Sequence, residues 1–177
     1  LRLFGVARSN RSGHTVSADE LRTVVAETGT VIPQRHRQML LSLLDLERGT
    51  VNDIMVPRQD IAGIDLEDDW DDILDQIRQT PHTRLPVYRE NLDKLAGVLV
   101  RRDLEPFLEG MPEADFKLEE LAHPPLFIPT TSRLGTALKQ MQAARSHLAF
   151  VIDEHGGLEG IVTLEDVIET LLGVDMN

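Results

Sequence analysis

The chain has 177 residues, a net charge of −12 at pH 7 and no cysteine. This length buries one substantial core or two small ones packed together, and the missing cysteines exclude a disulfide framework and thiolate chemistry. Residues 1–50 carry a net charge of +2 and the rest −14. The acidic body argues against nucleic-acid binding and leaves two interpretations open, solubility and the binding of a cationic metal or metal-bound nucleotide. No run of 18 apolar residues is present, so no membrane-spanning segment is expected.

The first fifty residues are expected to form a flexible leader (1–16) followed by a helical connector (17–50). Ser17 and Glu20 have the spacing of a capping box, in which each side chain accepts a hydrogen bond from the other's backbone N–H. A first helix is therefore expected to begin after Ser17, and Gly29 is expected to end it. A second helix is expected from about Pro33 to Leu46, because apolar residues recur there on one face.

The rest of the chain contains one unit of fifty-odd residues twice, at an offset of 63 residues. Gly97–Leu104 aligns with Gly160–Val167, and Arg84–Tyr88 aligns with His147–Val151. Both copies read as a glycine, an apolar strand and an aspartate that opens an apolar helix. Such self-similarity predicts two halves that share a core around a pseudo-twofold axis, with two related clefts between them.

Each copy is expected to have the order β-α-β-β-α, which makes the fold class α/β. The first copy (51–110) is expected to have strands at 61–64, 85–88 and 95–100, a turn at 91–93, and helices at 71–79 and from Asp103 to about Gly110. A linker (111–123) rich in Glu, Asp and Pro follows. The second copy (124–177) is expected to have strands at 126–129, 148–152 and 158–162, and helices at 132–144 and 164–172.

No catalytic motif is found, so the chain is not expected to be an enzyme. Gly-x-Ser-x-Gly, His-Glu-x-x-His and the P-loop are all absent from the sequence. The six histidines show no metal-ligand spacing, and no protein metal site is expected.

Two polar trios occupy matching positions, directly before a strand in each copy. They are His82-Thr83-Arg84 in the first and Arg145-Ser146-His147 in the second. Arginine and hydroxyl groups suit phosphate oxygens, so a phosphate-binding edge and ordinary surface polarity both remain open as interpretations.

Thr163 and Asp166 form the second candidate pair. Asp166 is explained either as a helix N-cap or as a carboxylate that accepts the hydroxyls of a ribose, beside a helix N-terminus that suits an anion. The first copy keeps Asp103 but has Val100 where the second has Thr163. The two clefts should therefore differ, because one of them lacks a hydroxyl that could face a phosphate.

The repeated unit resembles a tandem pair of cystathionine-β-synthase (CBS) domains, a Bateman module. Thr50–Arg58, Asp153–Gly157 and Val162–Glu169 are, more narrowly, similar to the CorB/CorC magnesium and cobalt efflux family, which is related to the animal CNNM transporters. Leu1–Gly5 and Glu20–Val25 favour its membrane-anchored CorB branch. The likeness covers nearly all of residues 17–173.

The resemblance implies that an adenine nucleotide, ATP or AMP, with or without Mg²⁺, binds between the CBS repeats. Its ribose would lie on Asp166, its phosphates near Thr163, Thr83 and Arg84, and its base against Phe127-Ile128-Pro129. The residues expected at this site are His82, Thr83, Arg84, Pro86, Phe127, Ile128, Pro129, Thr163 and Asp166. A second, weaker cleft is expected at Val56, Asp103, Arg145, Ser146 and His147.

The function implied by the resemblance is a regulatory, nucleotide-sensing module of a membrane magnesium or cobalt transporter. The full-length protein would hold it at the cytoplasmic face of the inner (plasma) membrane through an N-terminal transmembrane domain, which this soluble fragment lacks. A homodimer is expected, with an interface made by the helices at 71–79, 104–109, 134–143 and 165–172. The alternatives are a purely structural dimerisation module with an empty cleft and a regulatory domain of a soluble enzyme.

Overall fold

The computed structural model describes residues 17–27, 32–46, 49–104 and 117–172. The expected leader, the helix end at Gly29 and the part of the first copy's last helix beyond Leu104 lie outside these residues. The helices are α1 (Ala18–Glu27), α2 (Gln34–Leu46), α3 (Trp70–Gln79), α4 (Arg101–Leu104), α5 (Leu118–Leu121), α6 (Leu134–Ala144) and α7 (Leu164–Leu172), with short 3-10 turns η1 (Val51–Asp53) and η2 (Arg58–Asp60). The strands are β1 (Val56–Pro57), β2 (Ile64–Asp65), β3 (Arg84–Arg89), β4 (Asn91–Val100), β5 (Phe127–Pro129), β6 (Leu148–Ile152) and β7 (Leu158–Thr163).

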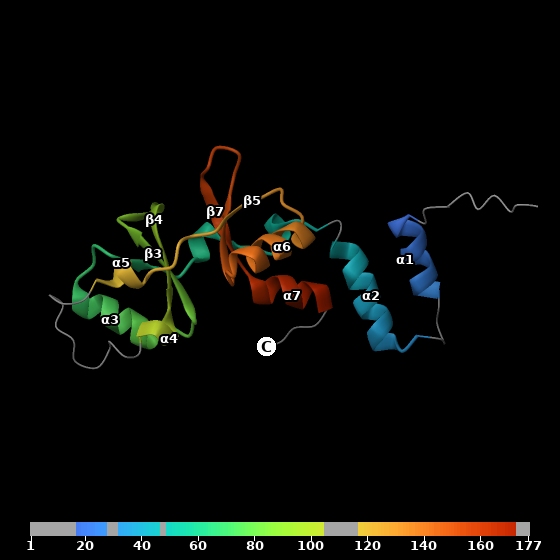
Figure 1. The fold of residues 1–177 in the computed structure, drawn as a ribbon, viewed down its shortest axis with the longest axis horizontal. Coiled ribbons are helices and arrows are strands. Elements are labelled where there is room, and N and C mark those ends of the chain that lie inside the picture. Colours follow the sequence, from blue (N-terminus) through green and yellow to red (C-terminus); the bar gives the residue numbers. More distant parts are fainter. Residues whose placement is uncertain (1–16, 28–31, 47–48, 105–116, 173–177) are drawn as a thin grey trace, which may run out of the picture.

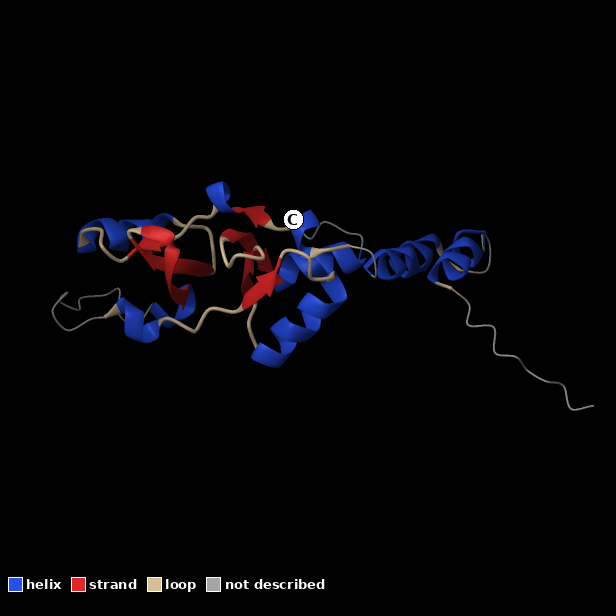
Figure 2. Ribbon diagram, turned by 90° about the horizontal axis from the view of Figure 1, so that it is seen from above, coloured by secondary structure: helices blue, strands red, loops and turns tan. Residues whose placement is uncertain are grey.

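The predicted α/β fold of two related copies is confirmed. The first copy runs β2-α3-β3-β4-α4 and the second β5-α6-β6-β7-α7. Figures 1 and 2 show the strands of both copies side by side in the body of the molecule, with α1 and α2 at one end.

The capping box at the start of α1 is also confirmed. The Ser17 backbone N–H donates to Glu20 Oε2 at 3.0 Å, and the Glu20 N–H donates to Ser17 Oγ at 3.2 Å. α1 packs on α2, and α2 packs on α7 of the second copy. The connector is thus attached to the second half of the molecule. No helix in the described part of the chain is long and apolar enough to cross a membrane.

The segment that precedes the first strand of each copy, residues 49–63 before β2 and 117–126 before β5, is called its lead-in, and it joins the sheet of the other copy. The sheet of the second copy has the order β1-β7-β6-β5, and β1 belongs to the lead-in of the first copy. In β1, Val56 pairs with Ile161 of β7. His123 occupies the related position in the lead-in of the second copy and pairs with Val98 of β4. The His123 N–H donates to the Val98 carbonyl at 2.8 Å, and the Val98 N–H donates to the His123 carbonyl at 3.0 Å. The lead-ins are therefore exchanged between the halves.

The hydrophobic cores follow the same exchange. Val51, in the lead-in of the first copy, is fully buried among residues of the second copy such as Ile128 and Met141. Leu118 of α5 is buried among residues of the first copy such as Leu85 and Leu99. The end of the expected linker is consequently a helix that completes the core of the first copy. A third buried cluster, which contains Val98, Leu148, Phe150, Leu158 and Ile161, joins the two copies.

The repeated glycine of the two copies is explained by these crossings. A Cβ added at Gly160 would overlap the carbonyl oxygen of Val56, and one at Gly97 would lie 2.6 Å from the carbonyl oxygen of His123. No side chain can be accommodated at such distances without moving the crossing backbone.

Three local expectations are corrected. The turn expected at 91–93 lies at Glu90, whose φ of 62° makes the tight reversal and allows β4 to begin at Asn91. α4 begins at Arg101, whose N–H donates to the Thr83 carbonyl, so Asp103 lies within the first turn and is not the cap. The strand expected from Ile61 begins only at Ile64, because the 3-10 turn at 58–60 precedes it.

Replacing Gly160 by alanine is expected to lower the free energy of unfolding by about 1–3 kcal/mol, because the methyl group forces β1 away from β7. Gly135→Ala is the matched control, since nothing lies within 4 Å of its added methyl. Its stability should be unchanged or raised by up to about 1 kcal/mol, because alanine is the better helix former. Urea denaturation followed by circular dichroism measures both, and equal stabilities of the two variants would contradict the crossing geometry.

Candidate functional site

Two related clefts lie between the copies. The Thr163 cleft, with a volume of about 500 Å³, is lined by residues of the first lead-in (Val56, Asp60, Ala62), by Pro81–Arg84 and Pro86, by Leu148, and by Ile161, Thr163, Glu165 and Asp166. The Val100 cleft, of about 630 Å³, is lined by His123–Leu126, by Ala144–Leu148, and by Arg84, Val98, Val100, Arg102 and Asp103. The Thr163 cleft therefore lies between the end of the β6–β7 hairpin and the loop before β3. The Val100 cleft lies between the end of the β3–β4 hairpin and the loop before β6.

Thr163 and Asp166 are locked together at the junction of β7 and α7. Asp166 Oδ2 accepts hydrogen bonds from the Thr163 backbone N–H at 2.9 Å and from its hydroxyl at 2.6 Å. The Asp166 N–H in turn donates to Thr163 Oγ1 at 3.1 Å. All three contacts leave Asp166 Oδ1 without a hydrogen bond from the part of the chain that the structure describes, so this oxygen can accept a ligand hydroxyl. The Thr163 hydroxyl donates to a ligand only when its proton leaves Asp166 Oδ2, which gives up the 2.6 Å hydrogen bond.

The opposite wall of the Thr163 cleft is the loop at 81–84. The Thr83 carbonyl accepts the Arg101 N–H at 2.9 Å, and the Arg101 guanidinium donates to the Thr80 carbonyl at 2.8 Å. These bonds fix the loop against α4. The guanidinium of Arg84, whose side chain is 24% exposed, lies 3.6 Å from the Glu165 carboxylate. Arg84 also lines the Val100 cleft, so it is shared by the two clefts, as is Leu148.

Arg58 holds the first lead-in in place. Its guanidinium donates to both oxygens of Asp93 in β4, at 2.7 and 2.9 Å, and this pairing lowers the pKa of the Asp93 carboxyl below its ordinary value. The contact ties η2, and with it Val56 and Asp60, to the first copy while β1 remains paired with the second.

The Thr163 cleft is acidic. Three carboxylates, Asp60, Glu165 and Asp166, line it, against Arg84 as the one Lys or Arg among the described residues there. A ligand with several negative charges would be repelled at this site unless a cation accompanied it.

The structure brings most of the predicted site residues together. His82, Thr83, Arg84, Pro86, Thr163 and Asp166 all line the Thr163 cleft. Asp103, Arg145, Ser146 and His147 line the Val100 cleft, as predicted for the second site.

Two placements differ from the prediction. Val56 lines the Thr163 cleft and not the second one, because β1 pairs with β7. Phe127, Ile128 and Pro129 line neither cleft, since they form β5, which β6 separates from β7, and Ile128 is fully buried. The apolar wall of the Thr163 cleft comes instead from the lead-in and Ile161.

The residues of the Thr163 cleft that the sequence did not predict are Asp60, Ala62, Pro81, Leu148, Ile161 and Glu165. The signal for Glu165 was present, because it aligns with Arg102 at the 63-residue offset and so marks a charge difference between the copies. Asp60 and Ala62 had no such signal, since the lead-ins of the two copies differ in length.

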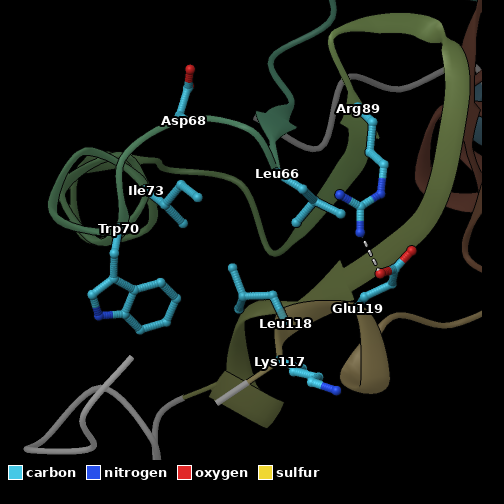
Figure 3. A pocket seen from close by; sticks show the side chains of 8 residues that line it. All are labelled: Leu66, Asp68, Trp70, Ile73, Arg89, Lys117, Leu118 and Glu119. Atoms are coloured by element: carbon cyan, nitrogen blue, oxygen red, sulfur yellow. Dashed lines mark hydrogen bonds and ion pairs between the residues drawn. The ribbon is translucent and has the colours of Figure 1, made fainter. Parts of the chain in front are cut away.

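A third pocket, of about 440 Å³, lies between the first copy and α5 and is shown in Figure 3. Its one arginine, Arg89, is already paired with Glu67 and Glu119, each at 2.6 Å. These hydrogen bonds raise the pKa of the Arg89 guanidinium above its ordinary value. Two carboxylates, Asp68 and Glu119, also line the pocket, together with Lys117, whose ammonium group lies 3.8 Å from Glu120. The wall therefore offers a phosphate no excess of positive charge.

Comparison with known proteins gives consistent results. A family model described as the CBS domain matches residues 51–109 and 118–173. The magnesium and cobalt efflux protein CorC of Salmonella typhimurium is 34% identical over 163 residues, which are 91% of this chain and 56% of CorC. The chain spans between 38% and 56% of the length of the first curated relatives it matches.

Two solved structures are similar over most of the chain. The CBS domain of a bacterial CNNM/CorC family Mg²⁺ transporter in complex with ATP has 38% identity and a TM-score of 0.70, and the match covers 81% of this chain and 100% of that one. A CBS-domain pair from Klebsiella pneumoniae with bound AMP has 36% identity and a TM-score of 0.65, covering 70% of this chain and 98% of that one.

Proposed function

We propose a function for this chain on the basis of its family. The chain belongs to the CBS-domain family, as a tandem pair of the CNNM/CorC kind. Its proposed function is that of the nucleotide-sensing regulatory module of a membrane transporter for magnesium or cobalt. The module performs no catalysis itself. In the full-length transporter it lies at the cytoplasmic face of the membrane and responds to an adenine nucleotide in the Thr163 cleft.

The observation that carries this proposal is the convergence of two polar segments on one cleft. Thr163 and Asp166 of the second copy face the loop that carries Thr83 and Arg84 of the first. The ribose binds Asp166 Oδ1 and the phosphates lie between the Thr163 hydroxyl and Arg84, a pairing of charges and donors that suits phosphate oxygens. The base packs on Val56, Ala62 and Ile161. Related CBS structures that contain AMP and ATP support the choice of an adenine nucleotide.

The charge of the cleft favours ATP as its Mg²⁺ complex. Asp60, Glu165 and Asp166 oppose a bare triphosphate, and the single nearby guanidinium of Arg84 already lies beside Glu165. A divalent cation held by the phosphates reverses the interaction with these carboxylates from repulsion to attraction.

The route from the cleft to the connector is short. The chain passes from α2 directly into the lead-in whose Val56 lines the cleft, and α2 also packs on α7, whose first turn contains Asp166. A nucleotide that binds two arrangements of these elements with different affinity shifts their populations. The connector would pass that shift to the membrane domain.

We also propose that the module works as a homodimer. Ile73 of α3, Ala137 of α6 and Val167 of α7 are buried inside the fold. The exposed large apolar side chains of the described residues are Leu21, Val24, Leu40, Leu43 and Phe127. Apolar side chains left on the surface favour self-association.

Replacing Thr163 by valine should weaken ATP binding about ten- to hundredfold. The change removes a hydroxyl with little change in volume, and a hydrogen bond to a charged group contributes about 1.5–3 kcal/mol. Thr170→Val is the matched control, because Thr170 lies on the adjoining helix α7 and its hydroxyl donates to the Asp166 carbonyl at 2.8 Å, but it does not line the cleft. Isothermal titration calorimetry measures both affinities, and circular dichroism checks the fold. Unchanged affinity in a folded Thr163→Val variant would refute the site.

Removing Mg²⁺ should weaken ATP binding, and Glu165→Gln should reduce that dependence. Without Mg²⁺ the variant should bind ATP more tightly than the wild type, because a repelling carboxylate is gone and Arg84 is released toward the phosphates. With Mg²⁺ present the variant should show no such gain. Calorimetric titrations in Mg²⁺ and in EDTA provide the four affinities. Identical ATP affinity of the wild type in both buffers would show that no metal takes part.

The homodimer is tested by sedimentation equilibrium at micromolar concentration. The expected mass is twice that of the 19.8 kDa chain, and replacing Leu40 and Leu43 by serine shows whether α2 contributes to the interface. A mass equal to one chain over the whole concentration range would exclude the dimer.

A further inference from the structure

We propose that His147 is a positioning residue of the Thr163 cleft, which acts through Glu165 and couples the binding of ATP to the uptake of a proton. This inference rests on the proposed function, because it concerns the regulation of the same site. The affinity for the nucleotide then rises as the pH falls through the neutral range, in which histidine titrates.

Glu165 lies beside two basic groups that come from matching positions of the repeat. Its carboxylate oxygen Oε1 lies 3.6 Å from the Arg84 guanidinium and 3.7 Å from His147 Nδ1. Arg84 and His147 are equivalent at the 63-residue offset, and Glu165 is equivalent to Arg102. The first copy therefore has two arginines at the positions of His147 and Glu165, and two cations cannot form this pair. The contact belongs to the second copy alone.

The backbone fixes the positions of His147 and Glu165. The Leu164 N–H donates to the His147 carbonyl at 2.9 Å, where Leu148 pairs with Thr163 across the hairpin. This bond holds the first turn of α7 against the start of β6. The side chains of His147 and Glu165 are 48% and 52% exposed, so the imidazole can exchange a proton with the solvent while it stays beside the carboxylate.

The other charged groups near His147 do not supply a second carboxylate for it. His147 lines the Val100 cleft together with Arg84, Arg102 and Arg145, whose charges repel an imidazolium. Asp103 lines the same cleft, but its oxygens lie 3.3 Å from His123 Nε2 and 3.6 Å from Arg102 Nε. Among the described residues, Glu165 is thus the carboxylate available to a protonated His147.

Nucleotide binding changes the partners of Glu165. In the proposed site the phosphates draw the Arg84 guanidinium away from Glu165, which leaves an uncompensated carboxylate beside the ligand. A protonated His147 neutralises that carboxylate, and the phosphates also offset the charge of Arg84 that would repel the imidazolium. Both effects favour protonation of His147 in the complex. Because linkage is reciprocal, a lower pH then favours the complex.

The test is isothermal titration calorimetry with ATP in EDTA, at about pH 6 and about pH 8, which lie on either side of the range where histidine titrates. We expect His147→Gln to bind ATP like the wild type at the higher pH. At the lower pH it should bind about two- to fivefold more weakly, the effect of one exposed ion pair. Titrations in buffers of different ionisation enthalpy should show a smaller proton uptake for the variant. His155→Gln is the matched control, because His155 is exposed and lines neither cleft.

The Glu165→Gln background separates the role of His147 from that of His82, which lines the Thr163 cleft itself. If His147 acts through Glu165, the effect of His147→Gln should disappear in this background. A histidine that contacts the phosphates directly would keep its effect there. Protons bound by His82 or by ATP are common to the wild type and His147→Gln, so they cancel in the comparison.

Four outcomes would overturn the proposal. They are equal pH dependence in the wild type and His147→Gln, an equal loss of affinity at both pH values, an effect of His147→Gln that persists in Glu165→Gln, and binding of ATP in Mg²⁺ but not in EDTA at about pH 6. Each of them leaves the proposed function intact, because ATP still binds in the Thr163 cleft. The proposed function fails, and this inference with it, if ATP does not bind even in Mg²⁺.

Discussion

Each half of this molecule completes the hydrophobic core of the other half. Val51 is buried in the core of the second copy, and Leu118 is buried in the core of the first. This exchange brings each lead-in across a hairpin of the opposite copy, where Gly97 and Gly160 leave room for the backbone. Both clefts lie beside these crossings. Because the same burial stabilises the fold and shapes the binding sites, a change in the angle between the copies alters both clefts together.

The two clefts also show how two related copies of one fold differ in charge. The backbone positions are equivalent, but Glu165 of the Thr163 cleft is matched by Arg102 in the Val100 cleft, while Asp166 is matched by Asp103. Arg84 lines both clefts and faces Glu165 across one of them.

Much of this architecture is predictable from the sequence, because the repeat carries it. The constant offset of 63 residues aligned both hairpins and both polar trios. The family resemblance then placed Thr163 and Asp166 opposite the loop at Arg84, and these residues line one cleft in the structure. The capping box at Ser17 was equally local and equally readable. In each case the pattern and the structural feature involve neighbouring residues, or residues related by the repeat.

The features that the sequence did not predict are long-range. The offset of 63 residues does not align the two lead-ins. Val56 and His123 are equivalent only because Val56 pairs with Ile161 and His123 pairs with Val98 at the same place in each copy. Without that pairing, Val56 was assigned to the wrong cleft, and Phe127 was expected to pack on the base although β5 lies on the far side of β6. Strand exchange is fixed by tertiary burial, for which a single sequence has no local signal.

The most direct test of the account is a crystal structure of the chain grown with ATP and Mg²⁺. The account predicts one nucleotide in the Thr163 cleft, with its ribose hydroxyls on Asp166, its phosphates between Thr163 and Arg84, and its base against Val56 and Ala62. A nucleotide seated against Phe127–Pro129, or a Thr163 cleft that stays empty while ATP binds elsewhere, would contradict it.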